Sequence, residues 1–374
     1  MYERSARHPF AHLQVASGYS LKYGTATPHA LAARAAELDM PIMGLTDRDG
    51  LYGAVQWARA CLDTGIRPVI GVDLAVESLH APVASRTTHR RTPAHGGTWI
   101  DESRPRVVLL ATGARGWASL CRLVSAAHGG HTERDDPWLP WSALQGNHEG
   151  VIALLTPGSE VGRALAAHRE YLADSLVRPW REIFGRRLGI AVTCHRRPGS
   201  TAVAAATVRW ARGIGAPVVL TNAVRYLQPR DSRIADVLDS ARRLVPLRSR
   251  HIRPDNGEAF VKGTVQMAQI ADDIAQAAGE RDGRRLLLDT WRLAEHCVID
   301  PAQDMGIGDV FVPELDVLLR RPVPSDEAVT LADALLRERC ERQIPERYLR
   351  ARDRRQARSR LEEELRTIVH LGFS

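Results

Sequence analysis

Short apolar runs, each bounded by turn-forming residues, alternate with longer amphipathic segments through the first part of the chain. The seven runs are 12–16, 41–46, 68–76, 107–111, 151–155, 188–194 and 217–222. The segments between them are rich in alanine and long enough for crossover helices, for example 28–38, 52–62, 116–127 and 202–213. Strands that alternate with helices are typical of α/β proteins. The sequence therefore predicts an α/β fold, either a parallel barrel or an open sheet.

Two stretches interrupt this alternation. Residues 80–106 are rich in Pro, Gly, Ser, Thr and Arg, which predicts a long loop or insertion, either ordered or disordered. After about residue 284 the pattern becomes mainly helical and highly charged. Because 374 residues exceed what one hydrophobic core usually serves, we expect one domain at 1–283 and a second, partial domain at 284–374.

The net charge of +7 suits a nucleic-acid partner, because cations neutralise phosphates in such complexes. Only Lys22 and Lys262 are lysines, however, and GC-rich coding produces the same preference for arginine without any phosphate contact. Arginines are dense from 337 to 366, with Glu362, Glu363 and Glu364 among them. Two interpretations stay open for this segment: a solvated helix face with i,i+4 ion pairs, or a basic helix that faces nucleic acid.

The five cysteines and the amino terminus bear on the compartment. The cysteines are scattered, without a C-x-x-C pair, which predicts neither a disulfide framework nor a zinc site. Residues 1–10 contain Arg4, Arg7 and His8 and no apolar core of a signal peptide, and no apolar stretch approaches the length of a membrane span. We therefore expect a cytoplasmic protein with no membrane contact.

Several residues could suggest catalysis, but their spacing argues against it. Cys194 and His195 are neighbours, and adjacent strand residues point to opposite faces of a sheet. The chain has no Walker A sequence and no G-x-G-x-x-G fingerprint. His12 stands alone at a strand start, which is typical of a structural residue. Five further histidines lack the spacing of a metal site: His80, His89, His95, His128 and His131.

Six blocks of the sequence together resemble one family. In chain order they are HLQVASGYSL, MPIMGLTDRDGLYGAVQWARAC, GIRPVIGVDLAV, LLATGARGWASLCRLVSAAH, GAPVVLTNAVRYL and RLEEELRTIVHLGFS. They resemble, in order and spacing, the alpha subunit of bacterial DNA polymerase III, a C-family DNA polymerase. The first five correspond to its polymerase-and-histidinol-phosphatase (PHP) domain, and the sixth to the helix that leads into the polymerase palm. The resemblance implies a distorted (β/α)7 PHP barrel at 1–283, followed by the leading part of a palm.

Metal-binding PHP domains carry H-x-H, T-D-H, G-x-E and D-x-H motifs at their strand ends, and this chain departs from nearly all of them. The residues at the corresponding positions are Gln14, Ala16, Tyr23, Arg48, Asp73, Ala223 and Arg225. Alanine cannot bind a metal, and arginine repels one. The resemblance therefore implies a degenerate PHP domain with no metal. We expect Arg48 and Arg225 to pair instead with Asp47 and Asp73, since a buried carboxylate needs a partner.

The resemblance also implies a function. The whole protein would be a DNA-directed DNA polymerase, a nucleotidyltransferase of DNA replication or of error-prone repair synthesis, and the lost ligands favour the error-prone branch. Its catalytic palm aspartates and their magnesium would lie beyond residue 374, so this segment would bind no cofactor, hold no catalytic residue and be inactive alone. Expected partners are primed template DNA, deoxynucleotides, the sliding clamp, and a proofreading subunit or a mutasome adaptor.

Two other functions stay open. One is a PHP-type metal-dependent phosphoesterase or exonuclease, in which His12, Asp47, Asp73 and His195 would form a different cluster. The other is a non-catalytic remnant that binds DNA or polymerase partners.

Overall fold

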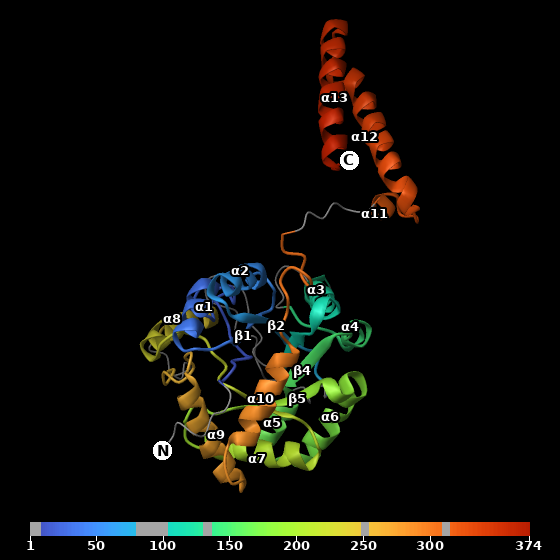
Figure 1. Ribbon diagram of the computed structural model, residues 1–374. Helices are drawn as coiled ribbons and strands as arrows, with labels where there is room; N and C mark the ends of the chain where they lie inside the picture. The colour runs from blue at the N-terminus through green and yellow to red at the C-terminus, as the bar shows by residue number, and fades with distance from the viewer. Residues whose placement is uncertain (1–8, 80–103, 130–136, 248–253, 309–314) are drawn as a thin grey trace. The chain divides into compact units, whose positions relative to one another are not determined.

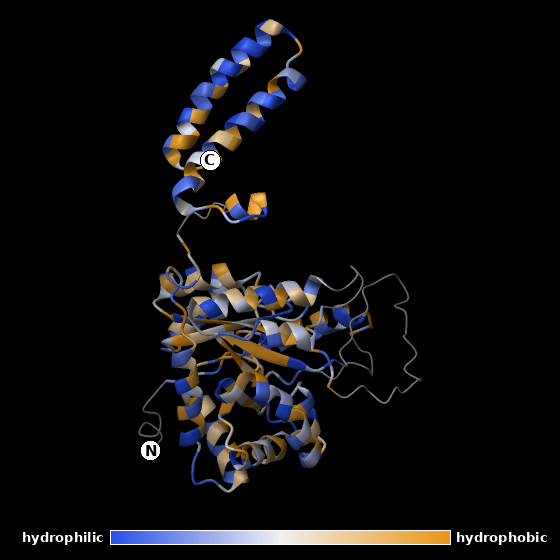
Figure 2. Cartoon of the chain, turned by 90° about the vertical axis from the view of Figure 1, so that its right-hand side faces the viewer, coloured by the Kyte–Doolittle hydropathy of each residue, from blue (hydrophilic) through white to orange (hydrophobic). Residues whose placement is uncertain are grey.

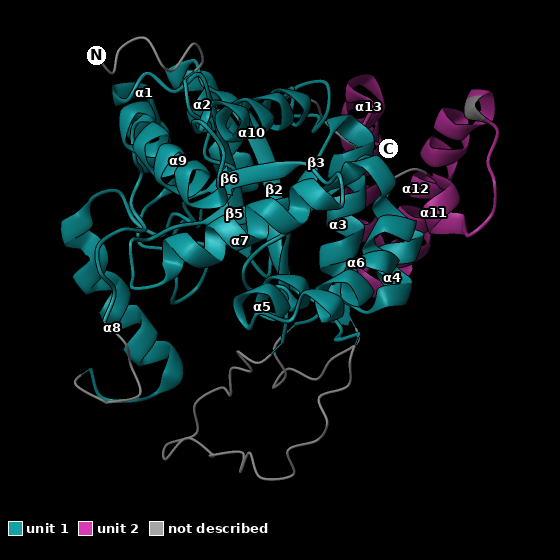
Figure 3. Cartoon of the chain, turned by 90° about the horizontal axis from the view of Figure 1, so that it is seen from below, with its two compact units in different colours: residues 1–307 teal, residues 308–374 magenta. Residues whose placement is uncertain are grey.

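The computed structural model describes residues 9–79, 104–129, 137–247, 254–308 and 315–374. The chain divides into two compact units, Met1–Ile307 and Gly308–Ser374 (Figure 3).

The first unit is built on a curled six-stranded sheet in the order β1-β2-β3-β4-β5-β6 (Figure 1). Its strands are β1 (Ile42–Arg48), β2 (Arg67–Ala75), β3 (Arg106–Ala111), β4 (Val151–Leu155), β5 (Leu188–Thr193) and β6 (Val218–Thr221). Neighbouring strands are parallel except that β3 runs antiparallel to both β2 and β4. The α/β fold is confirmed, and the sheet is mixed where we predicted a parallel one.

The predicted first strand, 12–16, closes the sheet without forming a regular strand of its own. Val15 makes a parallel bridge with Val224, which follows β6. On the other side, the amide of Thr46 in β1 donates to the carbonyl of Val15 at 2.8 Å. The segment therefore connects the two edges of the sheet, and the barrel has six strands and one bridging segment in the place of seven strands.

Helices cover the outside of the sheet. They are α1 (Pro28–Glu37), α2 (Ala54–Thr64), α3 (Gly113–Gly129), α4 (Trp141–Gly146), α5 (Glu160–Ala166), α6 (Glu170–Phe184), α7 (Ser200–Gly213), α8 (Ser232–Arg243), α9 (Thr264–Ala278) and α10 (Arg284–His296). Local chemistry sets several of their ends: the Thr27 hydroxyl accepts from the amide of Ala30 at the start of α1, and Gly65 ends α2 with a φ of 72°. Their apolar faces form the main core with the outward side chains of the strands.

Alternate residues of the strands point into the barrel and fill one end of it. Ile42, Val69, Val108, Leu110 and Val219 form a second apolar cluster there, together with Trp291 and Cys297 of the α10 region. Successive side chains of a strand point to opposite faces of the sheet, which explains the division between an inner and an outer core. The filled end leaves the carboxyl ends of β1, β2, β4, β5 and β6 as the place for a site.

The chain from 284 to 307 packs with the first unit. The Thr290 hydroxyl in α10 accepts from the amide of Leu220 at 2.8 Å, and the amide of Ile299 donates to the carbonyl of Pro68 at 2.9 Å. We predicted that the barrel domain ends at 283, whereas the compact unit extends to Ile307. The reason is that α10 supplies apolar side chains to the barrel interior.

The second unit is a helical hairpin. It contains α11 (Leu315–Leu319), α12 (Ser325–Arg347) and α13 (Ala351–Leu371). An ion pair between Arg337 and Glu362 joins the two long helices, which are mainly hydrophilic in Figure 2. That this unit begins a polymerase palm stays a prediction. No helix among the described residues is long and apolar enough to cross a membrane.

Candidate functional site at the barrel mouth

Arg106 is the central cation of the barrel mouth. Its Nε lies 2.8 Å from Asp73 Oδ1 and one of its terminal nitrogens lies 2.8 Å from Asp49 Oδ1. Burial opposes the charge of Arg106, but the carboxylates of Asp73 and Asp49 outweigh burial and raise the pKa of the guanidinium. β3 starts at Arg106 and runs antiparallel to β2, so this side chain reaches Asp73 from the neighbouring strand.

Asp47 is bound by hydroxyl and amide groups. Its carboxylate accepts from the amide of Ser17 at 2.7 Å, from the Ser20 hydroxyl at 2.7 Å and from the Ser17 hydroxyl at 2.8 Å. Burial raises the pKa of Asp47, and the hydrogen bonds from Ser20 and Ser17 oppose that rise. Asp47 therefore has partners without any cation.

Arg48 and Arg225 lie against the same aromatic ring. The guanidinium carbon of Arg48 is 4.3 Å from the centroid of the Tyr23 ring, and that of Arg225 is 4.2 Å from it. Arg242 follows at 5.4 Å. A negative ring face attracts cations at such distances, so Tyr23 brings three positive charges together.

Arg225 is also paired with carboxylates from outside the strands. Its terminal nitrogens donate to Asp239 of α8 at 3.0 and 2.8 Å, and Asp255 lies 3.7 Å away. The residue is only 9% exposed. Its pKa is raised, because Tyr23, Asp239 and Asp255 outweigh the effect of burial. Two parallel hydrogen bonds to one carboxylate hold the guanidinium in a fixed orientation.

These partners differ from the ones we predicted. We expected Arg48 and Arg225 to pair with Asp47 and Asp73, but Asp73 pairs with Arg106 and Asp47 with two serines. Adjacent strand residues point to opposite sides, which separates Asp47 from Arg48. An arginine does neutralise Asp73, but it is Arg106 and not Arg48 or Arg225.

The remaining degenerate positions offer no metal ligands. Gln14 accepts through Oε1 from the Thr221 hydroxyl at 3.1 Å, and Thr221 lies 2.7 Å from the Thr193 hydroxyl. Ala16 is buried and Ala223 is half-buried with a φ of 41°. Alanine has no donor atom for a metal, and the guanidiniums of Arg48 and Arg225 are cations. The residues at the mouth therefore do not fit the metal cluster of a PHP enzyme.

The alternative cluster of His12, Asp47, Asp73 and His195 is not assembled. His12 Nε2 lies 2.9 Å from the carbonyl oxygen of Lys262, and His195 Nε2 lies 2.7 Å from that of Asn222. Burial lowers the pKa of both histidines, that of His12 to about 4. Within the described parts of the chain, no group of three or more His, Cys, Asp or Glu side chains could hold a metal ion. His80, His89, His95 and His131 lie outside the described residues.

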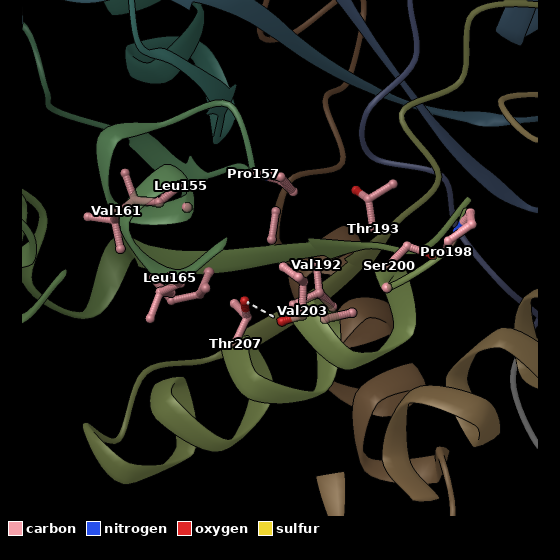
Figure 4. A pocket seen from close by; sticks show the side chains of 15 residues that line it. Leu155, Pro157, Val161, Leu165, Val192, Thr193, Pro198, Ser200, Val203 and Thr207 are labelled. Atoms are coloured by element: carbon pink, nitrogen blue, oxygen red, sulfur yellow. Dashed lines mark hydrogen bonds between the residues drawn. The ribbon is translucent and has the colours of Figure 1, made fainter. Parts of the chain in front are cut away.

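A separate cavity of about 270 Å³ lies between β4, β5, α5 and α7 (Figure 4). Its walls are mainly apolar, with Leu155, Val161, Val192 and Val203 among them. The polar side chains at its edge already have partners within the protein: Thr207 donates to the carbonyl of Val203, and Thr193 contacts Thr221. The cavity is therefore an apolar space with no group that would select a polar ligand.

Sequence reasoning missed Arg106, Asp239 and Asp255. Arg106 stands directly before an apolar strand, and a charged residue at a predicted strand end was the signal that could have identified it. Asp239 and Asp255 carried no comparable signal, since they belong to α8 and a loop far along the chain from Tyr23.

Comparisons with known proteins show which families the chain is similar to. The family model described as "PHP domain" matches residues 12–195. An error-prone DNA polymerase from Anaeromyxobacter dehalogenans (strain 2CP-1 / ATCC BAA-258) is 32% identical over 302 residues, which cover 77% of this chain and 23% of that protein. The DNA polymerase III subunit alpha of Escherichia coli (strain K12) is 28% identical over 371 residues, which cover 97% of this chain and 29% of that protein. An amidohydrolase structure from Chromobacterium violaceum, with bound sulfate and no metal, has a TM-score of 0.38 and 16% identity over 57% of this chain and 87% of that one.

Residues 12–195, which lie within the first unit, belong to a PHP domain by the matched model. Across much of its length, the PHP domain included, the chain is homologous to DNA polymerase III alpha subunits and to error-prone DNA polymerases. The chain spans about a quarter of the length of these curated relatives.

Proposed function

We propose that this chain is the N-terminal part of a C-family DNA-directed DNA polymerase, and that its PHP barrel is a structural domain that works without metal. The observation that carries the proposal is the position of Arg106 between Asp49 and Asp73. The guanidinium of Arg106 neutralises Asp73, and Asp73 occupies the position at which PHP enzymes have a metal-binding glutamate. A bound cation at the same carboxylate would repel Arg106.

The proposal extends to the whole protein. Template-directed synthesis, magnesium at palm aspartates beyond residue 374, and contacts with primed DNA, deoxynucleotides, a sliding clamp and a proofreading subunit or mutasome adaptor are proposed from homology. The loss of ligands at Ala16, Arg48, Ala223 and Arg225 favours the error-prone branch. The segment itself is proposed to be inactive alone.

The test measures metal content and hydrolysis together. The purified 374-residue chain is dialysed, its Zn, Mn, Mg and Fe contents are determined by elemental analysis, and nuclease and phosphoesterase activities are assayed with Mn²⁺ or Zn²⁺. Thermal unfolding with EDTA and with each metal is recorded beside them, because a ligand that binds the folded state raises the midpoint. We expect less than one bound ion per chain, no hydrolysis and the same midpoint in all buffers.

The matched control restores the family pattern at three positions, with Arg48→His, Ala223→Asp and Arg225→His. If the unaltered chain bound two or three ions tightly and hydrolysed the substrates, the proposal of a structural domain would be wrong. The chain would then be a PHP metallohydrolase.

A further inference from the structure

The positive charge of this protein is concentrated in one short segment. Residues 339–360 contain nine arginines and three acidic residues, a net charge of +6, while the whole chain has a net charge of +7. An arginine preference that arises from coding alone would distribute the excess along the chain. The segment covers the end of α12, the connection and the first half of α13, and we call it the basic tip of the hairpin.

Seven arginines of the basic tip are exposed and free of ion pairs with any described residue, and four of them lie at the start of α13 or just before it: Arg350, Arg352, Arg355 and Arg358. Arginines outside or at the border of the tip behave differently, since Arg337 pairs with Glu362, and Arg360 with Glu364 at 2.8 Å. Arg352, Arg355 and Arg358 follow at intervals of three residues, so they lie along one side of α13. The tip therefore presents several guanidiniums to solvent together.

The position of these arginines opposes helix stability. The amino-terminal end of a helix carries a partial positive charge, and acidic residues stabilise it there. The first half of α13 holds five arginines and one acidic residue, Asp353, whereas Glu362, Glu363 and Glu364 lie in its second half. The helix dipole and the arginines thus add to one positive potential, which an anionic partner would relieve.

The apolar content of the tip separates two kinds of anionic partner. A helix that binds a lipid surface needs a broad apolar face beside its basic one. The exposed large hydrophobic side chains of the tip are Tyr348 at 44% and Leu349 at 82%. Two such side chains against nine arginines fit the phosphate backbone of a nucleic acid better than a membrane.

We propose that the basic tip binds the phosphate backbone of duplex DNA without sequence preference. This rests on the proposed function, since a polymerase segment meets DNA, and it assigns that contact to a surface outside the barrel. Arg350, Arg352, Arg355 and Arg358 make the phosphate contacts, and the amino terminus of α13 adds to their field.

The experiment measures fluorescence anisotropy of a labelled duplex of about 30 base pairs with the full 374-residue chain, at several salt concentrations. The tip variant carries Arg350→Gln, Arg352→Gln, Arg355→Gln and Arg358→Gln. Its matched control removes the same charge from exposed helix positions of the first unit, with Arg115→Gln, Arg122→Gln, Arg178→Gln and Arg186→Gln. We expect the tip variant to bind at least about tenfold more weakly, with a salt slope smaller by about 3 to 4, and the control to change less than about twofold.

Equal losses in both variants would reduce the effect to net charge and overturn the proposal, as would the absence of DNA binding by the unaltered chain. Tip-dependent binding to phosphatidylserine vesicles without binding to DNA would overturn it in favour of a lipid surface. Far-ultraviolet circular dichroism checks that the tip variant keeps its helices, and an Arg→Lys variant at the four positions should retain DNA binding. Failure here leaves the metal and hydrolysis results untouched, so the two proposals fail separately.

Discussion

Arg106 Nε lies 2.8 Å from Asp73 Oδ1, so the first residue of β3 neutralises a carboxylate on the neighbouring strand β2. The Arg106 side chain is 17% exposed and the Asp73 side chain 15%. Since water reaches neither charge well, each is stabilised mainly by the other. An arginine is part of the folded chain at any metal concentration, whereas a bound ion can dissociate.

We predict that Arg106→Gln lowers the free energy of unfolding by about 2 to 4 kcal/mol, because Asp73 and Asp49 lose their cation in a largely buried position. Urea unfolding at pH 7 measures the loss. The double variant Arg106→Gln with Asp73→Asn should regain part of the stability, since it removes one of the unpaired charges. The single variant Asp73→Asn completes the cycle. A loss in the double variant equal to the sum of the losses in Arg106→Gln and Asp73→Asn would show that the two residues do not interact.

The Tyr23 ring gives a second prediction. Tyr23→Leu should destabilise the protein by about 1 to 2 kcal/mol, because Arg48 and Arg225 lose the ring face at 4.3 and 4.2 Å. Tyr23→Phe keeps the ring and should stay within about 0.5 kcal/mol of the unaltered protein. Urea unfolding of both variants decides the matter, and similar losses for Leu and Phe would show that the ring face is not the source of stability.

His12 makes stability depend on pH. Its pKa is about 4 in the folded protein and 6.5 in the unfolded chain, so the unfolded state binds the proton more readily. Its contribution is complete above pH 6.5 and is lost as the pH falls toward 4, a change of about 3 kcal/mol. Urea unfolding between pH 7 and pH 4.5 should show a weaker pH dependence for His12→Gln than for the unaltered protein.

Asp47 acts in the opposite direction over the acidic range and supplies the control. Because its pKa is raised in the folded state, it binds a proton more readily there and adds stability as the pH falls. Asp47→Asn removes this gain, so the variant should lose stability more steeply on acidification. A pH dependence that neither substitution alters would mean that other groups dominate the acid response.

The cavity between β5 and α7 permits a stabilising substitution. Val192 lines this space of about 270 Å³, and Val192→Ile should add about 0.5 to 1 kcal/mol of stability by filling part of it. The matched control is Val219→Ile in the filled barrel interior, which should cost about 1 to 3 kcal/mol through overpacking. Thermal unfolding of the two variants should shift in opposite directions.

The strands were easier to predict than their directions. The run 151–155 coincides with β4, and the runs 41–46 and 107–111 differ from β1 and β3 by one or two residues at their ends. Parallel and antiparallel strands can have the same apolar run, so the run 107–111 could not predict the direction of β3. The position of Arg106 at the mouth follows from that direction.

The pairings at the barrel mouth could not be predicted from the sequence. Resemblance pointed to Arg48, Asp73 and Arg225 at the strand ends, and the structure places all three in charged or aromatic contacts there. Which carboxylate meets which guanidinium depends on α8, which brings Asp239 to Arg225. No local pattern in the sequence encodes such a long-range approach.

The bridging segment at 12–16 constrains how this protein is made on the ribosome. His12 is hydrogen-bonded to a carbonyl 250 residues further along, and Val15 forms a parallel bridge with Val224 after β6. At ordinary translation rates of about 5 to 20 residues per second, the first segment waits on the order of 10 to 50 seconds for these partners to be synthesised. During that interval the side of the 12–16 segment that later meets Val224 is uncovered, so the nascent barrel is open to wrong pairing until β6 and the residues after it emerge.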